Sequence, residues 1–317
     1  MQNTLVVGVD IGGTKVAAGL VDSRGQILAR SRTPMVADDA ARGLAAVSTA
    51  IRELLPPPAD AQKISAIGIC APGPLNPVTG VVINPPNLQA WHNFPLADEV
   101  RRLYPSASVK IDNDANAAAL AEAKWGAGRG HRNVFYATIG TGIGAGIIFD
   151  GKIYHGRTGS AGEGGHMGVD ASGPLCPCGK RGCIEVLAAG PAIARRARQK
   201  LAQNPKSILL EMAGGDPQGV TSELVGKAYA LGDPVSKDVM TETLDLLAYW
   251  LGNIVDLLEP DVIVIGGGVS SLLAPFLDDI RDRWHVANPY PHQIPLVLAH
   301  YGEDAGIAGA AALCDTQ

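Results

Sequence analysis

The residues from His166 to Glu185, HMGVDASGPLCPCGKRGCIE, bring together side chains that could bind a metal. Cys176, Cys178 and Cys183 form a C-x-C-x₄-C pattern, and His166 lies ten positions before the first of them. Three thiolates and one imidazole make a Cys₃His set, which is typical of tetrahedral structural zinc. A redox C-x-x-C pair is absent because the first spacing is too short, and the remaining alternative is three unrelated thiols. We predict a closed zinc site that shapes a loop and does no chemistry itself.

Two glycine-rich stretches could bind phosphate. DIGGTKVAAGLVD (10–22) aligns with TIGTGIGAGIIFD (138–150) at a constant offset of 128 residues, and each predicts a strand, a glycine turn and a second strand. A dinucleotide fingerprint would need a helix directly after the turn, and none is indicated here. A glycine turn can offer a nest of backbone N–H groups to a phosphate, although it can also be an ordinary hairpin. The pair suggests two similar domains that face each other across a cleft.

Carboxylates stand next to predicted strand ends. Asp10 precedes the first glycine turn, where it could hold a water molecule on Mg²⁺, or could only stabilise the turn. Asp112, Asn113 and Asp114 precede an alanine-rich helix. Any of the three could cap that helix, but capping accounts poorly for three polar residues in a row. One of them could therefore face a substrate hydroxyl and act as a general base.

The bulk composition limits the class of protein. The 317 residues suggest two domains, and 46% hydrophobic with 18% charged residues indicates a globular chain with ample core. The net charge of −5 argues against a nucleic acid or an anionic membrane as partner. No apolar run approaches the roughly 18 residues of a spanning helix, and MQNTLVVGVD lacks the basic region of a secretory signal. We expect a cytoplasmic protein in which Cys70 and Cys314 are isolated structural thiols.

Alternating strand and helix signals predict an α/β fold. The chain opens with three strands, the last two joined by a hairpin signal at 23–25. Further strands are predicted at 64–70, 109–112, 261–268 and 294–300. Helices are predicted at 38–55 (ended by the prolines at 56–58), from 115, at about 186–203, at 235–258, from near 271 and at 304–314. Residues 71–95, rich in Pro, Gly and Asn, predict a long ordered loop, which is usually functional.

These pieces together resemble the ROK family, which comprises repressors, open reading frames and sugar kinases. The resemblance rests on LVVGVDIGGTK, APGPLNPVTGVV, PNLQAW, DNDANAAALAE, TIGTGIGAGII, GEGGHM, CPCGKRGCIE and DVIVIGGG, in the family's order. It implies an actin-like (ribonuclease H-like) two-domain α/β fold with a cleft between the domains. Residues 1–112 plus about 303–317 would form a small N-terminal domain. Residues 113–302 would form a larger domain that carries the zinc loop.

The resemblance also implies roles for single residues. Asp114 matches the family's catalytic base, which takes the proton from the sugar hydroxyl that attacks the γ-phosphate of ATP. The positions that match sugar contacts are Gly73, Asn87, Asn113, Glu163, His166 and Glu185. The positions that match the two phosphate loops and the adenosine strand are Gly12, Gly13, Thr14, Thr138, Gly140, Thr141, Gly142, Gly267 and Gly268. Asp10 would sit near Mg²⁺, and His166 would bind zinc with one ring nitrogen and a sugar hydroxyl with the other.

The implied activity is an ATP-dependent hexokinase that phosphorylates glucose at O6, a glucokinase. Alternatives within the family are N-acetylmannosamine or N-acetylglucosamine kinases, fructokinases or mannokinases, and enzymes that use polyphosphate. A sugar-responsive repressor would carry an N-terminal winged helix-turn-helix, and here the first phosphate strand starts near Thr4. An inactive sugar-binding protein would be expected to lack Asp114 or the phosphate loops. We therefore expect a kinase that binds glucose and ATP, without nucleic acid or membrane, as a dimer or tetramer.

Overall fold

The structure, a computed structural model, describes residues 6–54, 64–284, 286–287, 289 and 293–314. The predicted strand start near Thr4 and the prolines at 56–58 lie outside the described residues. The chain divides into two compact units: residues 1–136, 146–162 and 300–317 form the first, and 137–145 with 163–299 form the second. The predicted boundary instead assigned residues 113–136 and 146–162 to the second domain. That boundary and the cleft stay predictions.

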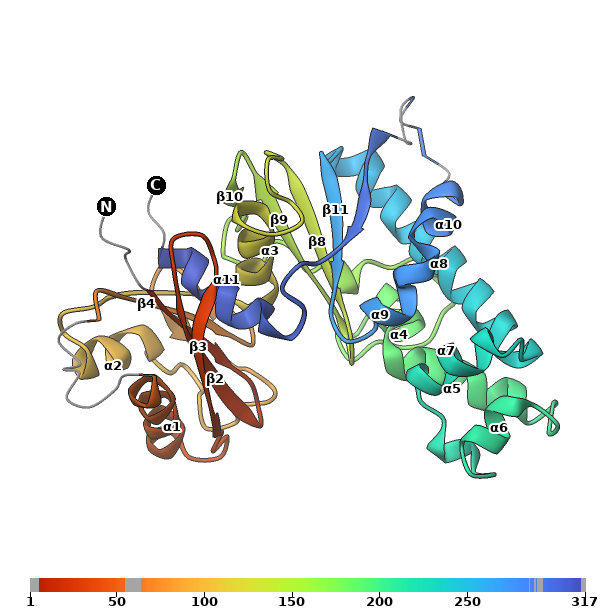
Figure 1. Ribbon diagram of the computed structural model, residues 1–317, viewed down its shortest axis with the longest axis horizontal. Coiled ribbons are helices and arrows are strands. Elements are labelled where there is room, and N and C mark those ends of the chain that lie inside the picture. Colours follow the sequence, from red (N-terminus) through yellow and green to blue (C-terminus); the bar gives the residue numbers. More distant parts are fainter. Residues whose placement is uncertain (1–5, 55–63, 285, 288, 290–292, 315–317) are drawn as a thin grey trace. The chain divides into compact units, whose positions relative to one another are not determined.

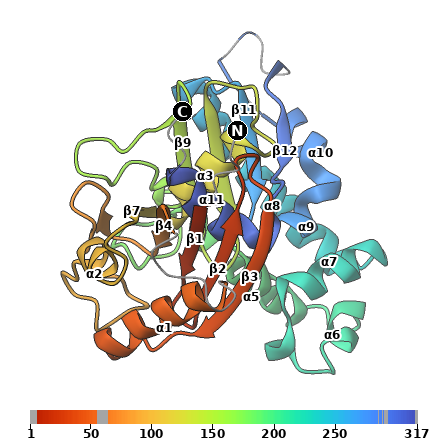
Figure 2. The same cartoon turned by 60° about the vertical axis from the view of Figure 1, so that its left-hand side comes forward.

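The first unit is built on a mixed sheet in the order β3-β2-β1-β4-β7, whose labels follow one another across Figure 2. Its strands are β1 (Val6–Ile11), β2 (Lys15–Val21), β3 (Ile27–Pro34), β4 (Ala66–Ala71) and β7 (Ser108–Asn113), with a small hairpin of β5 (Leu75–Asn76) and β6 (Val81–Val82). Its helices are α1 (Ala40–Glu53), α2 (Leu96–Leu103), α3 (Asp114–Lys124) and α11 (Ala305–Cys314), with the 3₁₀ turn η6 (Gly302–Asp304). β1 pairs antiparallel with β2 and parallel with β4, and β4 pairs parallel with β7.

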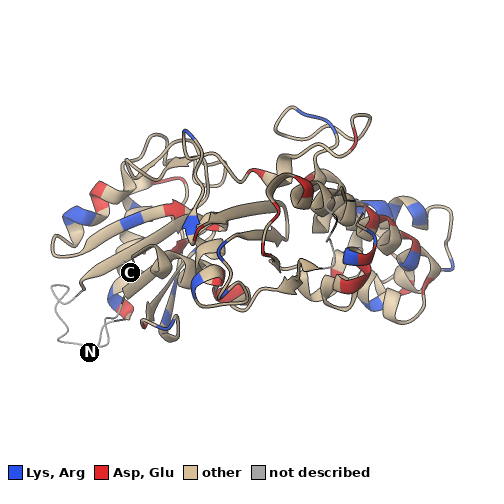
Figure 3. Ribbon diagram, turned by 90° about the horizontal axis from the view of Figure 1, so that it is seen from above, with Lys and Arg blue, Asp and Glu red and all other residues tan. Residues whose placement is uncertain are grey.

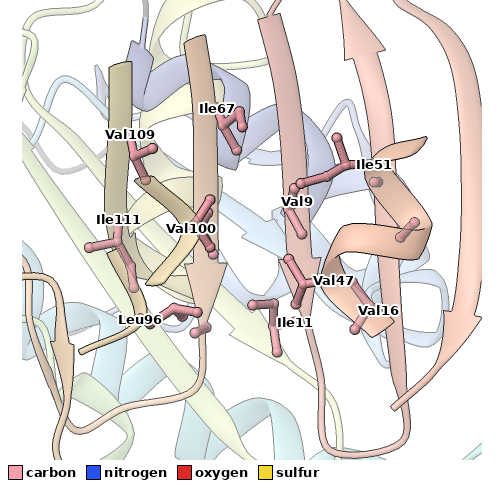
Figure 4. Packing of buried hydrophobic residues seen from close by; sticks show 14 of the residues in the cluster. Val9, Ile11, Val16, Val47, Ile51, Ile67, Leu96, Val100, Val109 and Ile111 are labelled. Atoms are coloured by element: carbon pink, nitrogen blue, oxygen red, sulfur yellow. The ribbon is translucent and has the colours of Figure 1, made fainter. Parts of the chain in front are cut away.

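One face of this sheet is covered by α1 and α2 (Figure 4). Side chains alternate along a strand, so Val9 and Ile11 of β1 point to the same face. They meet Val47 and Ile51, which share one face of α1 because they are four residues apart, and all four side chains are buried. Asp39 caps α1 by accepting a hydrogen bond from the backbone N–H of Arg42. This apolar layer holds β1 in a fixed position.

The opposite face of the sheet receives α11 at unusually close range. A Cβ placed on Gly8 would lie 2.1 Å from the carbonyl oxygen of Ile307, and one on Gly68 would lie 1.7 Å from that of Ala310. Only glycine fits at these two strand positions, because backbone atoms of the helix occupy the space of a side chain. The close packing brings the first turn of α11 against the carboxyl end of β1.

The second unit is rich in helices (Figure 1). They are α4 (Ile184–Ala188), α5 (Gly190–Leu201), α6 (Ile208–Met212), α7 (Ser222–Ala230), α8 (Pro234–Leu258), α9 (Ser270–Leu273) and α10 (Leu277–Asp282), with the 3₁₀ turns η2 (Gly164–His166), η3 (Pro217–Gly219) and η4 (Ala274–Phe276). A second sheet, in the order β10-β9-β8-β11-β12, comprises β8 (Val134–Ile139), β9 (Ile143–Phe149), β10 (Lys152–Ile153), β11 (Val262–Gly266) and β12 (Leu296–Leu298). Of these strands, β10 and parts of β8 and β9 belong to the first unit. α8 packs against α4, α5, α7 and α10.

Charged residues of both signs intermix along these helices (Figure 3). Lys200 of α5 pairs with Asp238 and Glu242 of α8, at 2.5 and 2.7 Å between its Nζ and the carboxylate oxygens. Arg283 likewise contacts Asp245 of α8 at 2.6 Å. Within the part of the chain that the structure describes, no helix combines the length and the apolar character needed to cross a membrane.

Most predicted elements agree with the structure, but two are shorter or interrupted and several short elements, including β5 and β6 within the predicted 71–95 loop, were not predicted. The helix predicted at 186–203 is interrupted at Ala189, whose extended backbone (ψ 163°) separates α4 from α5. Pro191 lies in the first turn of α5, where its missing N–H costs no hydrogen bond, so the break falls just before it. The predicted strand at 261–268 ends at Gly266, because Gly267 adopts a positive φ of 85°. α2, α6 and α7 were not predicted, since they are short helices of 8, 5 and 9 residues.

Candidate functional site

The carboxyl ends of three neighbouring strands bring three polar side chains into line. Asp10 of β1 is paired in register with Cys70 of β4, and Cys70 is paired with Asp112 of β7. The residues lie 60 and 42 positions apart in the chain, so only strand pairing makes them neighbours. Ligand sites in open α/β sheets form beyond the carboxyl ends of the strands. This edge of the first unit is therefore a candidate site.

Asp10 lies in a confined environment. The Cys70 thiol donates to its Oδ1 at 3.4 Å, and a Cβ on Gly306 of α11 would lie 2.4 Å from its Cγ. Burial raises the pKa of Asp10, and the hydrogen bond from Cys70 and the charge of Lys15 partly offset that rise. Burial also raises the pKa of the Cys70 thiol well above its usual range, reinforced by Asp10 and Asp114. A cation bound near Asp10 would relieve the cost of its buried charge.

The structure separates the roles of Asn113 and Asp114. Asn113 is the N-cap of α3, with its Oδ1 accepting from the backbone N–H of Ala115 at 2.9 Å and of Asn116 at 3.4 Å. Asp114 is the first helical residue, and its exposed carboxylate accepts from the N–H of Ala115 at 2.8 Å. Asp114 is thus an exposed carboxylate at a fixed place, and the task of capping falls mainly to its neighbour.

Asp112 carries a contact that sequence reasoning missed. Its buried carboxylate accepts from the backbone N–H of Asn113 at 2.8 Å and from Nδ2 of Asn116 at 3.0 Å. Nε2 of His155 lies 2.6 Å from its second oxygen, and this hydrogen bond raises the pKa of His155. The three contacts tie the start of α3 to the loop after β10. Because His155 lies 43 residues away from Asp112, no local pattern indicates the pair.

The first glycine hairpin joins β1 to β2. The N–H of Gly12 donates to the carbonyl of Lys15 at 2.9 Å, and Thr14 is exposed. A Cβ on Gly13 would lie 2.9 Å from the Cβ of Asn87, which places the tip of the 71–95 loop against the hairpin. Gly73 from the same loop lies next to Asn113, since its Cβ would come within 3.4 Å of the Asn113 amide nitrogen. The first unit thus gathers its predicted site residues at one edge.

In the second unit, the four predicted metal ligands lie together. The ligand atoms of His166, Cys176, Cys178 and Cys183 all fall within 4.8 Å of one another. Nδ1 of His166 is 3.7 Å from Sγ of Cys176, and the sulfurs of Cys178 and Cys183 are 3.6 Å apart. Tetrahedral ligands on a zinc ion, at about 2.3 Å each, would be separated by about 3.8 Å. The spacing is far too long for a disulfide, and the donor set fits zinc.

Tight turns of the chain produce this cluster. The N–H of Cys176 donates to the carbonyl of Lys180 at 2.8 Å, which closes a turn that contains Cys178. Gly179 and Gly182 have positive φ values of 91° and 60°. A Cβ on Gly182 would lie 1.7 Å from the carbonyl oxygen of Asp170, so glycine is required there for steric reasons as well. The spacing of the cysteines is therefore matched to a hairpin that brings their sulfurs together.

Glu185 connects this loop to the second glycine hairpin. It lies in the first turn of α4, two residues after the last cysteine, and its Oε2 accepts from the N–H of Ile143 at 2.9 Å. A Cβ on Gly142 would lie 2.5 Å from the same oxygen. His166 ends η2, and the exposed Glu163 precedes it, on a turn whose Gly165 abuts the carbonyl of Ile143. The predicted sugar contacts of this unit therefore surround the start of β9.

The turn of the second hairpin also meets the end of β11. The N–H of Val269 donates to the carbonyl of Ile139 at 2.8 Å, and Gly267 leaves no room for a side chain, because its Cβ would lie 2.4 Å from that carbonyl oxygen. A cavity of about 490 Å³ opens here, lined by Gly140, Thr141 and Gly268. Thr138 lies on β8 just before the turn and is half-buried.

A second cavity, of about 610 Å³, shares Gly268 and Val269 with the first and extends between α7 and α9. Its walls include Tyr229 and Phe276, whose rings are in edge contact with centroids 5.0 Å apart. Such a mostly apolar space suits a flat aromatic group. The sequence did not indicate that α7 forms a wall of this cavity, because its pattern of apolar residues is the same as that of any helix packed against a core.

Fold and site together define a class: an actin-like, two-domain α/β protein with two glycine-rich hairpins and a Cys₃His cluster. The family model described as "ROK family" matches residues 6–317. A curated glucokinase of Streptomyces coelicolor is 37% identical over 314 residues, covering 98% of this chain and 97% of the relative. An N-acetylmannosamine kinase of Escherichia fergusonii is 31% identical, covering 97% of each chain.

Solved structures are similar over the same length. A ROK family glucokinase from Streptomyces griseus, crystallised with glucose and AMPPNP, has a TM-score of 0.82, 36% identity and 98% coverage of both chains. The protein belongs to the ROK family. This confirms the family and the fold class that the motifs predicted.

Proposed function

We propose that the protein is an ATP-dependent glucokinase that transfers the γ-phosphoryl group of ATP to O6 of glucose. The observation that carries the proposal is similarity to glucokinases along nearly the whole chain, joined to an exposed Asp114 at the edge where Asp10, Asn113 and Asn87 gather. Phosphoryl transfer requires mainly positioning, charge neutralisation and a group that orients the nucleophile. The two units supply residues suited to each task.

Asp114 is proposed as the general base. Its carboxylate is exposed and is held by the N–H of Ala115, at the positive end of the α3 dipole. In this position the carboxylate can accept the proton of the sugar hydroxyl as O6 attacks. O6 is the primary, least hindered hydroxyl of the ring, which is why we assign it as the nucleophile.

Sugar recognition is proposed to come from the polar side chains that the family resemblance indicates. Each buried hydroxyl without a partner would cost about 1–3 kcal/mol, so a sugar site needs several convergent polar groups. In the second unit Glu163, His166 and Glu185 surround the start of β9, and in the first unit the Asn113 amide faces Gly73 and the 71–95 loop. We assign these side chains to the hydroxyls of the ring.

Zinc is proposed as a structural ion held by His166, Cys176, Cys178 and Cys183. The donor set and its spacing fit tetrahedral zinc with no open position. With Nδ1 of His166 directed at the cluster, its Nε2 is left for a sugar hydroxyl. The ion would fix the orientation of His166 and of the loop that leads to Glu185.

ATP is proposed to bind with its phosphates at the two glycine hairpins and its adenosine near Gly267 and Gly268. The cavity lined by Tyr229 and Phe276 is large enough for an adenine ring. Asp10 is the residue proposed to act on Mg²⁺, since its buried carboxylate gains from a nearby cation. The ion would neutralise charge on the transferring phosphates.

The proposed substrates also bear on where the protein works. ATP and incoming hexoses meet in the cytoplasm, which supports a cytoplasmic enzyme. The reaction needs neither nucleic acid nor membrane. A dimer or tetramer stays a prediction, which light scattering during gel filtration tests.

The decisive experiment combines a substrate panel with one substitution. Wild-type protein should convert glucose and ATP to glucose 6-phosphate and ADP. A coupled assay measures the ADP, and NMR identifies the position of the phosphate in the product. Asp114→Asn should lower kcat by roughly 100- to 10,000-fold and leave glucose binding nearly unchanged. Asp150→Asn, another exposed carboxylate of the first unit, is the matched control. An Asp114→Asn variant with more than about a tenth of wild-type kcat would mean that Asp114 is only a second cap.

A second candidate is an N-acetylmannosamine kinase, favoured by the relative from Escherichia fergusonii. Glucose and N-acetylmannosamine differ at C2, and extra bulk is rejected only where a pocket is rigid. If an N-acetylhexosamine exceeded glucose tenfold in kcat/KM, the substrate assignment would change while the kinase assignment would stand.

A further inference from the structure

The first unit contains a cavity of about 680 Å³ that no step of the proposed reaction uses. Its walls come from β7, α3, β10, the loop after β10 and the end of α11. This volume lies in the range of about 300–1,000 Å³ that is usual for small-molecule sites. The chemistry of the lining therefore indicates what the cavity could bind.

The lining is rich in cationic side chains. Lys110, Lys152 and Arg157 line the cavity, and among the described residues none of these three side chains forms an ion pair or hydrogen bond. This contrasts with the helices of the second unit, where Lys200 and Arg283 are each held by two carboxylates. In a chain with a net charge of −5, an unpaired cationic cluster creates a local potential that attracts anions.

The carboxylates of the lining are already engaged. Asp150 pairs with Arg132 at 2.5 Å, and Asp112 accepts from His155, Asn113 and Asn116. Neither carboxylate is therefore the partner of the three cations. Among the described residues no carboxylate pairs with these three cations, so solvent ions or a ligand can supply the counter-charge.

The loop after β10 adds backbone donors to the same cavity. Residues 156–159 (GRTG) line it, with positive φ values of 66° at Gly156 and 93° at Gly159. The backbone N–H groups of residues 156–160 donate to no acceptor within the described part of the chain. Successive free N–H groups beside glycines form a nest that binds anions, and the Thr158 hydroxyl offers one more donor. Fixed donors and mobile cations together are the features of a phosphate site.

The cavity is also connected to the catalytic segment. His155 lines it and contacts the buried carboxylate of Asp112 at 2.6 Å. Asp112 in turn holds Asn113 and Asn116 at the start of α3, the helix that begins with Asp114. A ligand that displaces His155 would therefore act on the helix end that carries the proposed base.

We propose that this cavity binds a small phosphorylated metabolite and that its occupancy changes turnover through His155 and Asp112. The phosphate group is held by the N–H groups of residues 156–159, by Arg157 and by Lys152. The effect on turnover rests on the proposed kinase function, whereas the binding site does not.

Calorimetry with inorganic pyrophosphate tests the site. Glucose and AMPPNP are first titrated and then kept saturating, so that the proposed substrate sites are filled, at 0.15 M KCl and constant free Mg²⁺. We expect one pyrophosphate site per chain. The Lys152→Gln/Arg157→Gln double variant should raise the Kd at least tenfold, and Arg24→Gln, an exposed arginine outside the cavity, should leave it within twofold. Initial rates are measured with and without pyrophosphate, and without it the double variant should keep kcat within twofold of wild type.

The outcomes separate the two proposals. Absence of saturable binding, or equal Kd in the double variant, would overturn the anion site. Binding that the double variant loses, without any change in wild-type kcat, would overturn the link through His155. Failure of glucose and AMPPNP to bind would instead contradict the proposed function. The pyrophosphate Kd of wild type and of the double variant, measured without glucose and AMPPNP, would still test the cavity in that case.

Discussion

The two glycine hairpins share a backbone pattern but obtain their carboxylate in different ways. At the offset of 128 residues, Asp10 of the first hairpin corresponds to Thr138 of the second. The first hairpin carries its acid on its own strand, enclosed by Cys70 and Gly306. The second receives Glu185 from α4, bound to the N–H of Ile143. Similar loops can thus serve different ligands when different neighbouring elements supply the charge.

This difference has a consequence for the sequence around each turn. A Cβ on Gly142 would displace the carboxylate of Glu185, whereas the corresponding Thr14 of the first hairpin is exposed. Gly13 instead adjoins Asn87, and its counterpart Thr141 lines a cavity. We therefore assign the first hairpin to the metal and phosphate side of the reaction and the second to both phosphate and sugar.

Within the comparison of the two hairpins, the largest expected effect comes from exchanging the acid of the first hairpin. Asp10→Asn should lower kcat by about 100-fold, the upper end for groups that act on a metal through its outer shell. Thr138→Val, at the corresponding position, should change kcat by less than fivefold. Steady-state kinetics at varied Mg²⁺ measure both. Without Mg²⁺, the Asp10→Asn variant should have a Tm no lower than wild type, because the substitution removes a buried charge. Equal kcat values for Asp10→Asn and Thr138→Val would contradict the proposed difference between the hairpins.

Loss of the metal should affect the sugar side. Cys178→Ser should reduce the zinc content and raise the KM for glucose by about tenfold, because the loop orients both His166 and Glu185. It should also lower Tm, while the KM for ATP should stay within twofold. Cys314→Ser, a thiol outside the cluster, is the control. Elemental analysis that finds no zinc in wild-type protein would remove the basis for this prediction.

A smaller effect is expected from a single methyl group in the second hairpin. Gly142→Ala would place Cβ 2.5 Å from Oε2 of Glu185, and the required shift should cost about 1–3 kcal/mol. We expect the KM for glucose to rise about fivefold or more. A Cβ on Gly140 would meet only the backbone nitrogen of Gly268, at 3.7 Å, so Gly140→Ala should leave the KM for glucose nearly unchanged. Matching kinetics for the two alanine variants would show that Glu185 does not depend on Gly142.

The smallest effect concerns the support of the first unit's site. His155→Leu removes the donor to Asp112 and should lower kcat two- to fivefold with KM unchanged, since a net hydrogen bond is worth about 0.5–1.5 kcal/mol. His155→Gln retains an N–H donor and should recover most of the loss. A loss of stability without this rescue would indicate that His155 only packs the loop.

The sequence by itself determined the elements and the chemistry that local spacing encodes. The C-x-C-x₄-C pattern with its glycines predicted a cluster of four ligands, which the structure brings within 4.8 Å. The glycine turns, the strand ends at Asp10 and Asp112 and the family membership followed from contiguous motifs. These features are local because turn conformation and strand or helix preference depend on neighbouring residues.

Contacts between distant segments were decided only by the tertiary structure. Three of these contacts join residues that no local sequence pattern links. They are the pairing of His155 with Asp112, the hydrogen bond from the N–H of Ile143 to Glu185, and the part of the cavity wall that α7 forms. The break at Ala189 likewise separates two helices that the periodicity had merged. Such contacts depend on strand register and on how closely helices pack, as with α11 over Gly8 and Gly68. Register and packing are set by the whole core, so a local stretch of sequence does not contain them.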